Sequence, residues 1–212
     1  MEIIMRPGLR LRFLIFIVLE AVIFSLFFMI YLSNITYVYW IYVTLTPVIL
    51  FFLIYMQGDM KASVRRLILS RDAVILLVVL FLWYYLYAVT GESVSYLTVT
   101  LYAPVLLEEV NFRYVVTVYL GTVTSMGTAS IIQAALYMVF YSSVLIAAPE
   151  AYPGLLSVFY LFDMFSIGLI YGVIYYFRKN IYIDMAIHFT LWAMIPFTPV
   201  WLAWLPYSMA PA

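Results

Sequence analysis

The sequence contains no cysteine, one histidine and few charged residues. Without cysteine the chain cannot form a disulfide framework. Charged residues make up 9% of the 212 residues, whereas 68% are hydrophobic and the mean hydropathy is +1.12. Soluble domains carry roughly 25% charged residues, so this chain cannot cover a water-facing surface, and we exclude a soluble or disordered protein. The net charge is zero, and nothing in the composition indicates a nucleic-acid partner.

Long apolar runs separated by short polar segments fill the chain, and we interpret each run as a membrane-spanning helix. About 20 apolar residues cross the hydrocarbon core, and a helix satisfies its own backbone hydrogen bonds in lipid. The predicted spans are 13–32, 36–56, 73–89, 95–119, 128–148, 155–177 and 181–205, the last interrupted by Pro196 and Pro199. The sequence therefore predicts an all-α polytopic transmembrane bundle of about seven helices, which forms a single integral-membrane domain over residues 1–212.

Positive charges are confined to one side of this predicted bundle. Every Lys and Arg except Arg113 lies in one of three segments, 1–12, 57–72 and 178–180. The connections predicted for the opposite side contain none. Because Lys and Arg are retained on the cytoplasmic side of a membrane, we expect a multi-pass protein of the cell membrane with a cytoplasmic N-terminus.

Ionisable residues within the predicted spans are candidates for function, because they are costly in lipid. They are Glu20, Glu108, Glu109, Arg113, Asp163, Asp184 and His188. Glu109 and Arg113, four residues apart, share a helix face and are expected to pair. Glu108 is rotated by about 100° from its neighbour and has no local partner, so we interpret it as a candidate general base that takes a proton from water. The alternative is a purely structural Glu–Arg pair that holds helices together.

His188, the single histidine, is expected at a depth similar to that of Glu108. Counting 1.5 Å per residue from the predicted inner face, His188 lies ~12 Å deep and Glu108 ~16 Å deep. Both residues can therefore meet in one polar cavity open to the cytoplasm, where an imidazole can donate to an oxyanion or relay a proton. Alternatively, His188 is a buried histidine bonded to a backbone or tyrosine oxygen. A zinc site is not expected, because a catalytic zinc takes three protein ligands and adjacent helical Glu side chains diverge.

The remaining acidic residues are expected to have structural or solvated roles. Asp184 is expected to face water near the inner end of the last span, and orientation of the His188 imidazole is its alternative role. Glu20 and Asp163 are expected to form structural hydrogen bonds. A small proton-linked carrier that uses Glu20, Glu108 and Asp163 is a weaker alternative, since no pair of broken helices recurs in the two halves.

Three features within residues 95–195 resemble the CAAX-protease and bacteriocin-processing family (CPBP, also called Abi) of intramembrane proteins. The stretch Glu108-Glu109-x-x-x-Arg113 has the family's Glu-Glu-x-x-x-Arg form. Further along, Gly168 and Gly172 make a small-x-x-x-small face for close helix packing, followed by a short basic turn and a helix that contains His188. The order of the Glu pair, an intervening helix and the histidine is also that of the family.

The chain departs from the family pattern at two positions. Tyr141 occupies the slot of the second-motif histidine, and Trp192 occupies that of the third-motif Asn or Asp. The resemblance implies that Glu108 activates water, that His188 and Tyr141 stabilise the tetrahedral oxyanion, and that the Glu109–Arg113 pair orders the helix. The Tyr141 phenol can donate a hydrogen bond but does not shuttle protons near neutral pH, and Trp192 offers a donor and no acceptor.

Two functions from different classes follow from this resemblance. The first is a glutamate-dependent intramembrane endopeptidase, a hydrolase without a cofactor, that cuts a membrane-embedded or lipid-modified peptide near the cytoplasmic face. The second is a catalytically inactive relative that binds a membrane peptide or a partner subunit in a scaffold or immunity-type role. Membrane lipid is a partner in both cases. The discriminating feature is whether Glu108, Tyr141 and His188 converge on a cavity that holds water.

Overall fold

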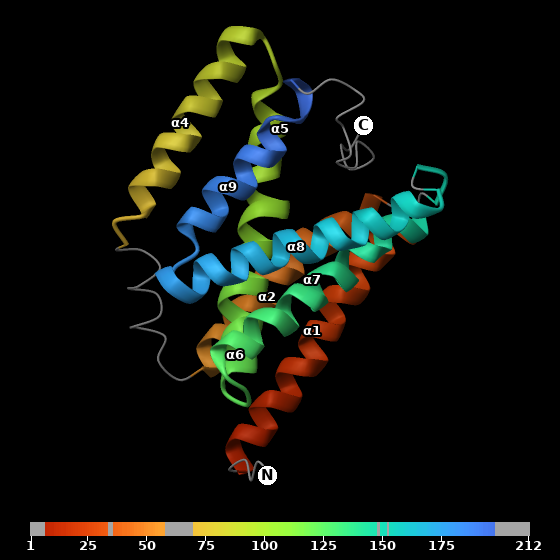
Figure 1. Cartoon of the computed structure of the whole chain (residues 1–212), viewed down its shortest axis with the longest axis vertical. Coiled ribbons are helices and arrows are strands. Elements are labelled where there is room, and N and C mark those ends of the chain that lie inside the picture. Colours follow the sequence, from red (N-terminus) through yellow and green to blue (C-terminus); the bar gives the residue numbers. More distant parts are fainter. Residues whose placement is uncertain (1–6, 34–35, 58–69, 148, 152, 198–212) are drawn as a thin grey trace.

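The computed structural model of the chain describes residues 7–33, 36–57, 70–147, 149–151 and 153–197, and within these ranges it is helical without strands (Figure 1). The α-helices are α1 (Pro7–Ser33), α2 (Thr36–Met56), α4 (Ala73–Thr90), α5 (Val94–Thr100), α6 (Thr117–Gly121), α7 (Met126–Ala147), α8 (Leu155–Arg178) and α9 (Tyr182–Ala193). Two wider π-helical segments, η1 (Leu101–Leu107) and η2 (Glu109–Val116), join α5 to α6. Residues 94–121 therefore form one continuous helix. Short 3-10 turns cover Pro149–Ala151 and Ile195–Phe197. The predicted all-α class is confirmed.

Five helices are long and apolar enough to cross a membrane. They contain the segments Gly8–Ile30, Tyr37–Met56, Ala73–Thr90, Met126–Ala147 and Leu155–Arg178. These segments correspond to five of the seven predicted spans. Four agree with the predicted bounds to within two residues, and the first begins five residues earlier than predicted. The predicted fourth span, 95–119, is the continuous helix of residues 94–121. The chain is therefore an integral, multi-pass membrane protein.

The seventh predicted span, 181–205, begins as expected but is helical over a shorter stretch. Helix α9 has 12 residues, about 18 Å at 1.5 Å per residue, which is less than the roughly 30 Å of a bilayer core. The helix ends at Ala193 because Pro196 has no N–H to donate to the carbonyl of Trp192, four residues earlier, and a 3-10 turn follows. Residues 198–205 of the predicted span lie outside the described residues.

The helices pack in both relative directions (Figure 1): α7 and α8 are antiparallel, whereas α4 runs parallel to α9 and α1 runs parallel to α7. The most extensive contact joins α7 to α8, while α1 packs on α2 and α7, and α4 packs on α9. In Figure 1 the N-terminal end of α1 and the α6–α7 turn lie at the bottom and the α8–α9 junction lies at the left. The α4–α5 turn lies at the top and the α7–α8 turn at the right. The connections expected in the cytoplasm thus lie away from those expected outside.

Glycines allow α7 and α8 to approach closely, as the sequence predicts. A Cβ atom at Gly168 would lie 3.1 Å from Ala134 Cα, and one at Gly172 would lie 2.8 Å from Gln133 Nε2. Both distances are shorter than ordinary van der Waals contact. The small face of α8 therefore brings the α7 backbone within reach of side chains on the opposite helix.

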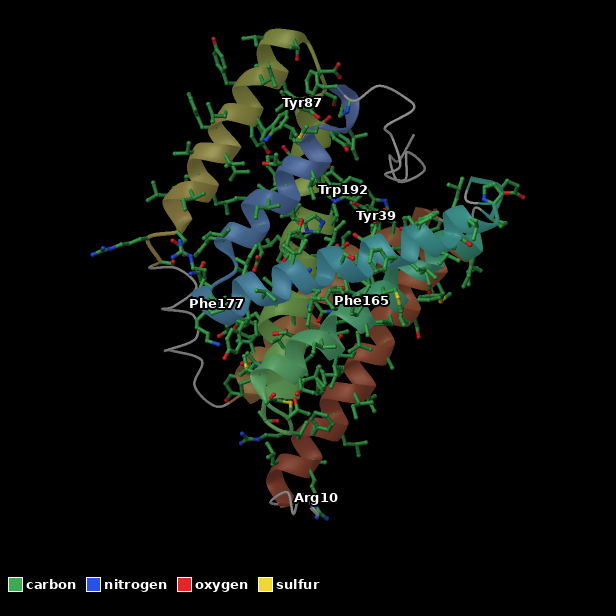
Figure 2. The ribbon with its side chains drawn as sticks, viewed as in Figure 1. Arg10, Tyr39, Tyr87, Phe165, Phe177 and Trp192 are labelled. Carbon is green, nitrogen blue, oxygen red and sulfur yellow. The ribbon has the colours of Figure 1, made fainter. Side chains whose placement is uncertain are left out.

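Large apolar side chains cover the outer surface of the bundle. Phe81 on α4 is 69% exposed, and Phe162 and Phe177 on α8 are 64% and 75% exposed. Phe177 projects from the end of α8 (Figure 2). Water-soluble proteins rarely expose an extended apolar surface of this kind, so these side chains suit contact with lipid.

A tyrosine hydroxyl binds a backbone carbonyl in the middle of α2 that has no partner within the helix. Pro47 lies inside this helix, and proline has no N–H to donate to the carbonyl four residues earlier. That carbonyl belongs to Val43, and it accepts a hydrogen bond of 2.8 Å from the hydroxyl of Tyr102 on η1. In lipid an unsatisfied carbonyl costs several kcal/mol, so Tyr102 repairs the helix across the bundle.

Tyrosines also bind the open carbonyls at helix ends. The last four carbonyls of an α-helix have no partner within the helix. Tyr119 donates to Leu53 O at 2.9 Å near the end of α2, and Tyr87 donates to Ala193 O at 2.9 Å at the end of α9. Tyr87 lies where α4 meets α9 (Figure 2). These bonds give part of the 21 tyrosines a structural role.

Candidate active site

The continuous helix 94–121 changes geometry where it carries its charged residues. The η2 segment begins at Glu109 and ends at Val116, and the amide of Thr117 donates to Phe112 O, five residues earlier. Such π-type turns are rare and are frequent at functional sites. They alter the rotation of the side chains that follow, so the direction of Glu108 and Glu109 cannot be derived from an ideal α-helix.

Glu109 and Arg113 form the predicted ion pair in the interior of the bundle. Arg113 Nε lies 3.2 Å from Glu109 Oε2, and both side chains are fully buried. Arg113 Nη1 donates to Gln133 Oε1 at 2.6 Å. The guanidinium also lies 4.8 Å from the ring centre of Tyr137 and 5.1 Å from that of Tyr171. Arg113 is thus held by a carboxylate, an amide and two aromatic rings.

His188 binds Glu109, whereas the sequence predicts that it meets Glu108. His188 Nδ1 lies 2.8 Å from Glu109 Oε1, and Trp192 Nε1 donates to His188 Nε2 at 3.0 Å. An indole N–H can only donate, so Nε2 accepts and the ring proton is on Nδ1, directed at Glu109. Glu109 faces α9 because the rotation of the π-helical segment, which the sequence does not reveal, turns this residue toward it.

Glu108 has a different partner, Tyr141 on α7. The Tyr141 hydroxyl donates to the carboxylate and lies 2.9 Å from Oε1 and 2.7 Å from Oε2. Tyr137, one turn earlier on α7, also faces this carboxylate. The Tyr141 phenol therefore donates a hydrogen bond, as the sequence indicates that it can, and this bond holds the Glu108 carboxylate in one orientation. Glu108 is 3% exposed.

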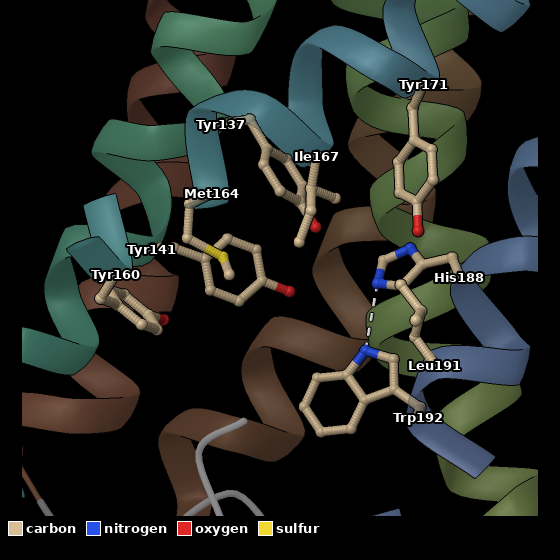
Figure 3. Close-up of a pocket in the computed structure, with 9 residues that line it drawn as sticks. All are labelled: Tyr137, Tyr141, Tyr160, Met164, Ile167, Tyr171, His188, Leu191 and Trp192. Atoms are coloured by element: carbon tan, nitrogen blue, oxygen red, sulfur yellow. Dashed lines mark hydrogen bonds between the residues drawn. The ribbon is translucent and has the colours of Figure 1, made fainter. Parts of the chain in front are cut away.

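A cavity of about 30 Å³ lies beside these residues (Figure 3). A cavity needs a volume of roughly 10–15 Å³ to hold one water molecule, so this cavity has room for one or two water molecules. Its lining residues are Tyr137, Tyr141, Tyr160, Met164, Ile167, Tyr171, His188, Leu191 and Trp192. Tyr141, which binds Glu108, and His188, which binds Glu109, thus share the wall of one water-sized space.

The wall that α8 contributes to this cavity is not among the features predicted from the sequence. Its members are Tyr160, Met164, Ile167 and Tyr171. Their spacing of four, three and four residues is the pattern of a single helix face. That spacing could have identified them as neighbours, although it does not reveal which helix they face.

The remaining predicted residues differ in outcome. Glu20 is buried and accepts a hydrogen bond of 3.1 Å from Asn111 Nδ2, as expected. The expectation for Asp163 is wrong, because its side chain is exposed on α8 and has no hydrogen bond to any described residue. The expectation that Asp184 faces water is also wrong. Asp184 is fully buried in the first turn of α9, near Glu109 and Arg113, because the packing around α9 covers this turn.

Metal ligands do not gather in the part of the chain that the structure describes. No three His, Cys, Asp or Glu side chains lie there in a group that could hold a metal ion. The chemistry available to the site from these residues is that of a buried carboxylate, phenols, an imidazole and an indole.

Comparison with known proteins identifies one family for this segment. The family model described as "Type II CAAX prenyl endopeptidase Rce1-like" matches residues 90–194. The matched region contains the Glu pair, Arg113, Tyr141 and the His188–Trp192 pair. No curated protein and no solved structure matches the chain.

Proposed function

Because the chain belongs through residues 90–194 to the Rce1-like type II CAAX prenyl endopeptidase family, as the CPBP resemblance implies, we propose that it is an intramembrane peptidase that uses Glu108 to activate water. The observation that carries this proposal is the contact between Tyr141 and Glu108 at a cavity large enough for water. Tyr141 and His188 line this cavity, whereas Glu108 is not among the lining residues and lies behind Tyr141, to which it is bonded. The arrangement supplies a fixed carboxylate next to the wall, a place for the nucleophile and an imidazole in the wall.

The proposed reaction is hydrolysis of a peptide bond by general base catalysis. Glu108 takes a proton from a water molecule in the cavity while the water oxygen forms a bond to the peptide carbonyl carbon. The carbonyl oxygen becomes an oxyanion. When the tetrahedral intermediate collapses, the C–N bond breaks, and the proton held by Glu108 goes to the departing amine. The carboxylate is then restored.

The other polar residues prepare this site rather than exchange protons with the substrate. Tyr141 orients the Glu108 carboxylate through its bonds to both oxygens. Glu109 accepts the Nδ1 proton of His188 and pairs with Arg113. A role of His188 in stabilising the oxyanion requires release of one of its nitrogens, since Glu109 and Trp192 engage both.

The substrate that suits the surroundings is a peptide delivered by the membrane. The outer surface of the bundle is apolar, and the name of the matching family refers to a CAAX prenyl endopeptidase. We therefore propose a lipid-modified or membrane-embedded peptide, cut near the cytoplasmic face. The segregation of Lys and Arg in the sequence supports the orientation of the chain, and the depths predicted for Glu108 and His188 below the inner face support the proposed side of the cut.

The test is cleavage of a fluorescence-quenched prenylated peptide by the purified protein in lipid vesicles. Glu108→Gln keeps the size of the side chain and removes the base, so cleavage is expected to fall by about 10²–10⁴-fold while the thermal unfolding midpoint is retained. Glu92→Gln, at an exposed position in the α4–α5 turn, is the matched control. Equal cleavage by the wild type and Glu108→Gln would overturn the proposal.

A specific observation keeps the binding function as the second candidate. Trp192 caps the Nε2 atom of His188, which leaves the imidazole without a free nitrogen. If the wild type binds the prenylated peptide without cutting it, and Glu108→Gln binds equally well, the inactive scaffold or immunity-type role is supported instead.

A further inference from the structure

The cavity needs a hydrogen-bond donor for an oxyanion, and most of its polar groups are already engaged. The Tyr141 hydroxyl donates to Glu108. The Trp192 indole donates to His188, and the Nδ1 proton of His188 points to Glu109. Using any of these groups for a new negative charge would break a bond that shapes the site.

Tyr171 differs from these groups. Its side chain is 1% exposed and lines the cavity, yet its hydroxyl has no hydrogen-bond partner in the described part of the chain. The ring centre lies 5.6 Å from that of His188, and in Figure 3 the hydroxyl points toward the imidazole side of the cavity. A buried hydroxyl without a partner is costly, so this donor is available to a ligand.

We propose that the Tyr171 hydroxyl is the donor that binds the oxyanion of the tetrahedral intermediate. This inference rests on the proposed peptidase function and adds to it a catalytic residue on α8. As water attacks, the electron pair of the carbonyl bond moves onto oxygen, and the Tyr171 O–H donates to that oxygen without losing its proton. When the intermediate collapses, the pair returns to the carbonyl.

The surroundings of Tyr171 favour this role in two ways. The Arg113 guanidinium lies 5.1 Å from the ring centre, and this cation–π contact holds the ring in one position. Gly172, the next residue, packs tightly against Ser130 and Gln133 of α7. Tyr171 is thus held on a rigid part of α8, and a donor fixed in advance is the kind that stabilises charge most effectively.

The decisive variant is Tyr171→Phe, which removes one oxygen atom and keeps the ring. Loss of one oxyanion donor lowers kcat by about 10²–10³-fold, and we expect that loss with KM within about 2-fold of wild type. Tyr176→Phe, at an exposed position on the same helix, is expected to keep the wild-type kcat. Binding of uncleaved peptide to Glu108→Gln, with and without Tyr171→Phe, is expected to be equal, which shows that the site is folded.

The outcomes separate this inference from the proposed function. If Glu108→Gln abolishes cleavage but Tyr171→Phe retains kcat within about 2-fold of wild type, the Tyr171 inference is wrong and the peptidase function stands. If Tyr171→Phe weakens peptide binding in the Glu108→Gln background as much as it lowers kcat, its role is structural and the inference is also overturned. If the wild type cuts no peptide, both fail together.

Discussion

Trp192 and His188 lie one turn apart on α9, and the indole nitrogen of the first donates to Nε2 of the second at 3.0 Å. The same imidazole donates through Nδ1 to Glu109 at 2.8 Å. One contact within α9 and one contact between helices together place the proton of the neutral imidazole on Nδ1.

The first prediction concerns the tautomer of this imidazole. The chain has a single histidine, so isotope-labelled histidine gives one set of nitrogen resonances. We expect the neutral form with the proton on Nδ1 in the wild type, because Trp192 can only donate to Nε2. Trp192→Phe removes that donor and is expected to admit a second form. A proton on Nε2 in the wild type would contradict the geometry.

The second prediction concerns the buried ion pair of Glu109 and Arg113. Arg113→Met leaves a carboxylate without its partner in the interior, and the free energy of unfolding is expected to fall by about 3–5 kcal/mol. Adding Glu109→Gln removes the uncompensated charge, so the double variant is expected to be more stable than Arg113→Met alone. Unfolding measured in detergent tests this, and additive losses would show that the pair does not couple.

The third prediction concerns the α7–α8 contact. A Cβ at Gly168 would lie 3.1 Å from Ala134 Cα and 3.2 Å from Tyr137 Cβ, so Gly168→Ala is expected to destabilise the protein by about 1–3 kcal/mol. Gly127→Ala is the control, since its nearest atom is Ser125 Oγ at 3.9 Å. A Gly168→Ala protein with an unchanged unfolding midpoint would mean that the helices are less tightly packed than described.

The fourth prediction concerns Tyr102 and the carbonyl of Val43. Tyr102→Phe is expected to cost about 0.6–1.7 kcal/mol, from the average to the largest value measured for hydrogen bonds between membrane helices. Pro47→Ala supplies an amide for the same carbonyl, so Tyr102→Phe is expected to cost less in that background. Tyr85→Phe, at an exposed position on α4, is the control. Equal costs in both backgrounds would show that the tyrosine does not serve the carbonyl.

The fifth prediction concerns orientation in the membrane. The chain has no cysteine, so a single introduced thiol reports on one position without a background. Ser125→Cys in the α6–α7 turn is expected to react with a membrane-impermeant maleimide only after the cytoplasmic side is opened. Glu150→Cys in the α7–α8 turn is expected to react from outside on intact cells. The reverse pattern would invert the predicted topology.

The sequence predicts local relationships in this site well. The Glu109–Arg113 pair follows from spacing along one helix, and the contact of Tyr141 with Glu108 is consistent with the family slot that Tyr141 occupies. Helix geometry determines the relative position of the first two residues, and the family resemblance indicates that of the second two. The close packing at Gly168 is of the same kind, since small residues spaced by four indicate a face before the partner is known.

The relationships that the sequence does not reveal depend on rotation and on packing between helices. Whether Glu108 or Glu109 faces His188 is set by the π-helical turns, which hydrophobic patterning does not show. Asp184 is near a predicted loop, and its burial depends on what covers the first turn of α9. Tyr171 is one tyrosine among 21. It is distinguished by a buried hydroxyl that has no hydrogen-bond partner among the described residues, which the sequence does not show.

The repair of α2 by Tyr102 has a consequence for biosynthesis. When α2 first enters the bilayer, its Pro47 leaves the Val43 carbonyl without a partner, and the hydroxyl that binds it belongs to the helix 94–121, which is synthesised later. Helix α2 therefore cannot satisfy this carbonyl by itself or with α1 alone. Complete backbone hydrogen bonding of α2 requires the helix that carries the paired glutamates, which couples the folding of α2 to that of the candidate active site.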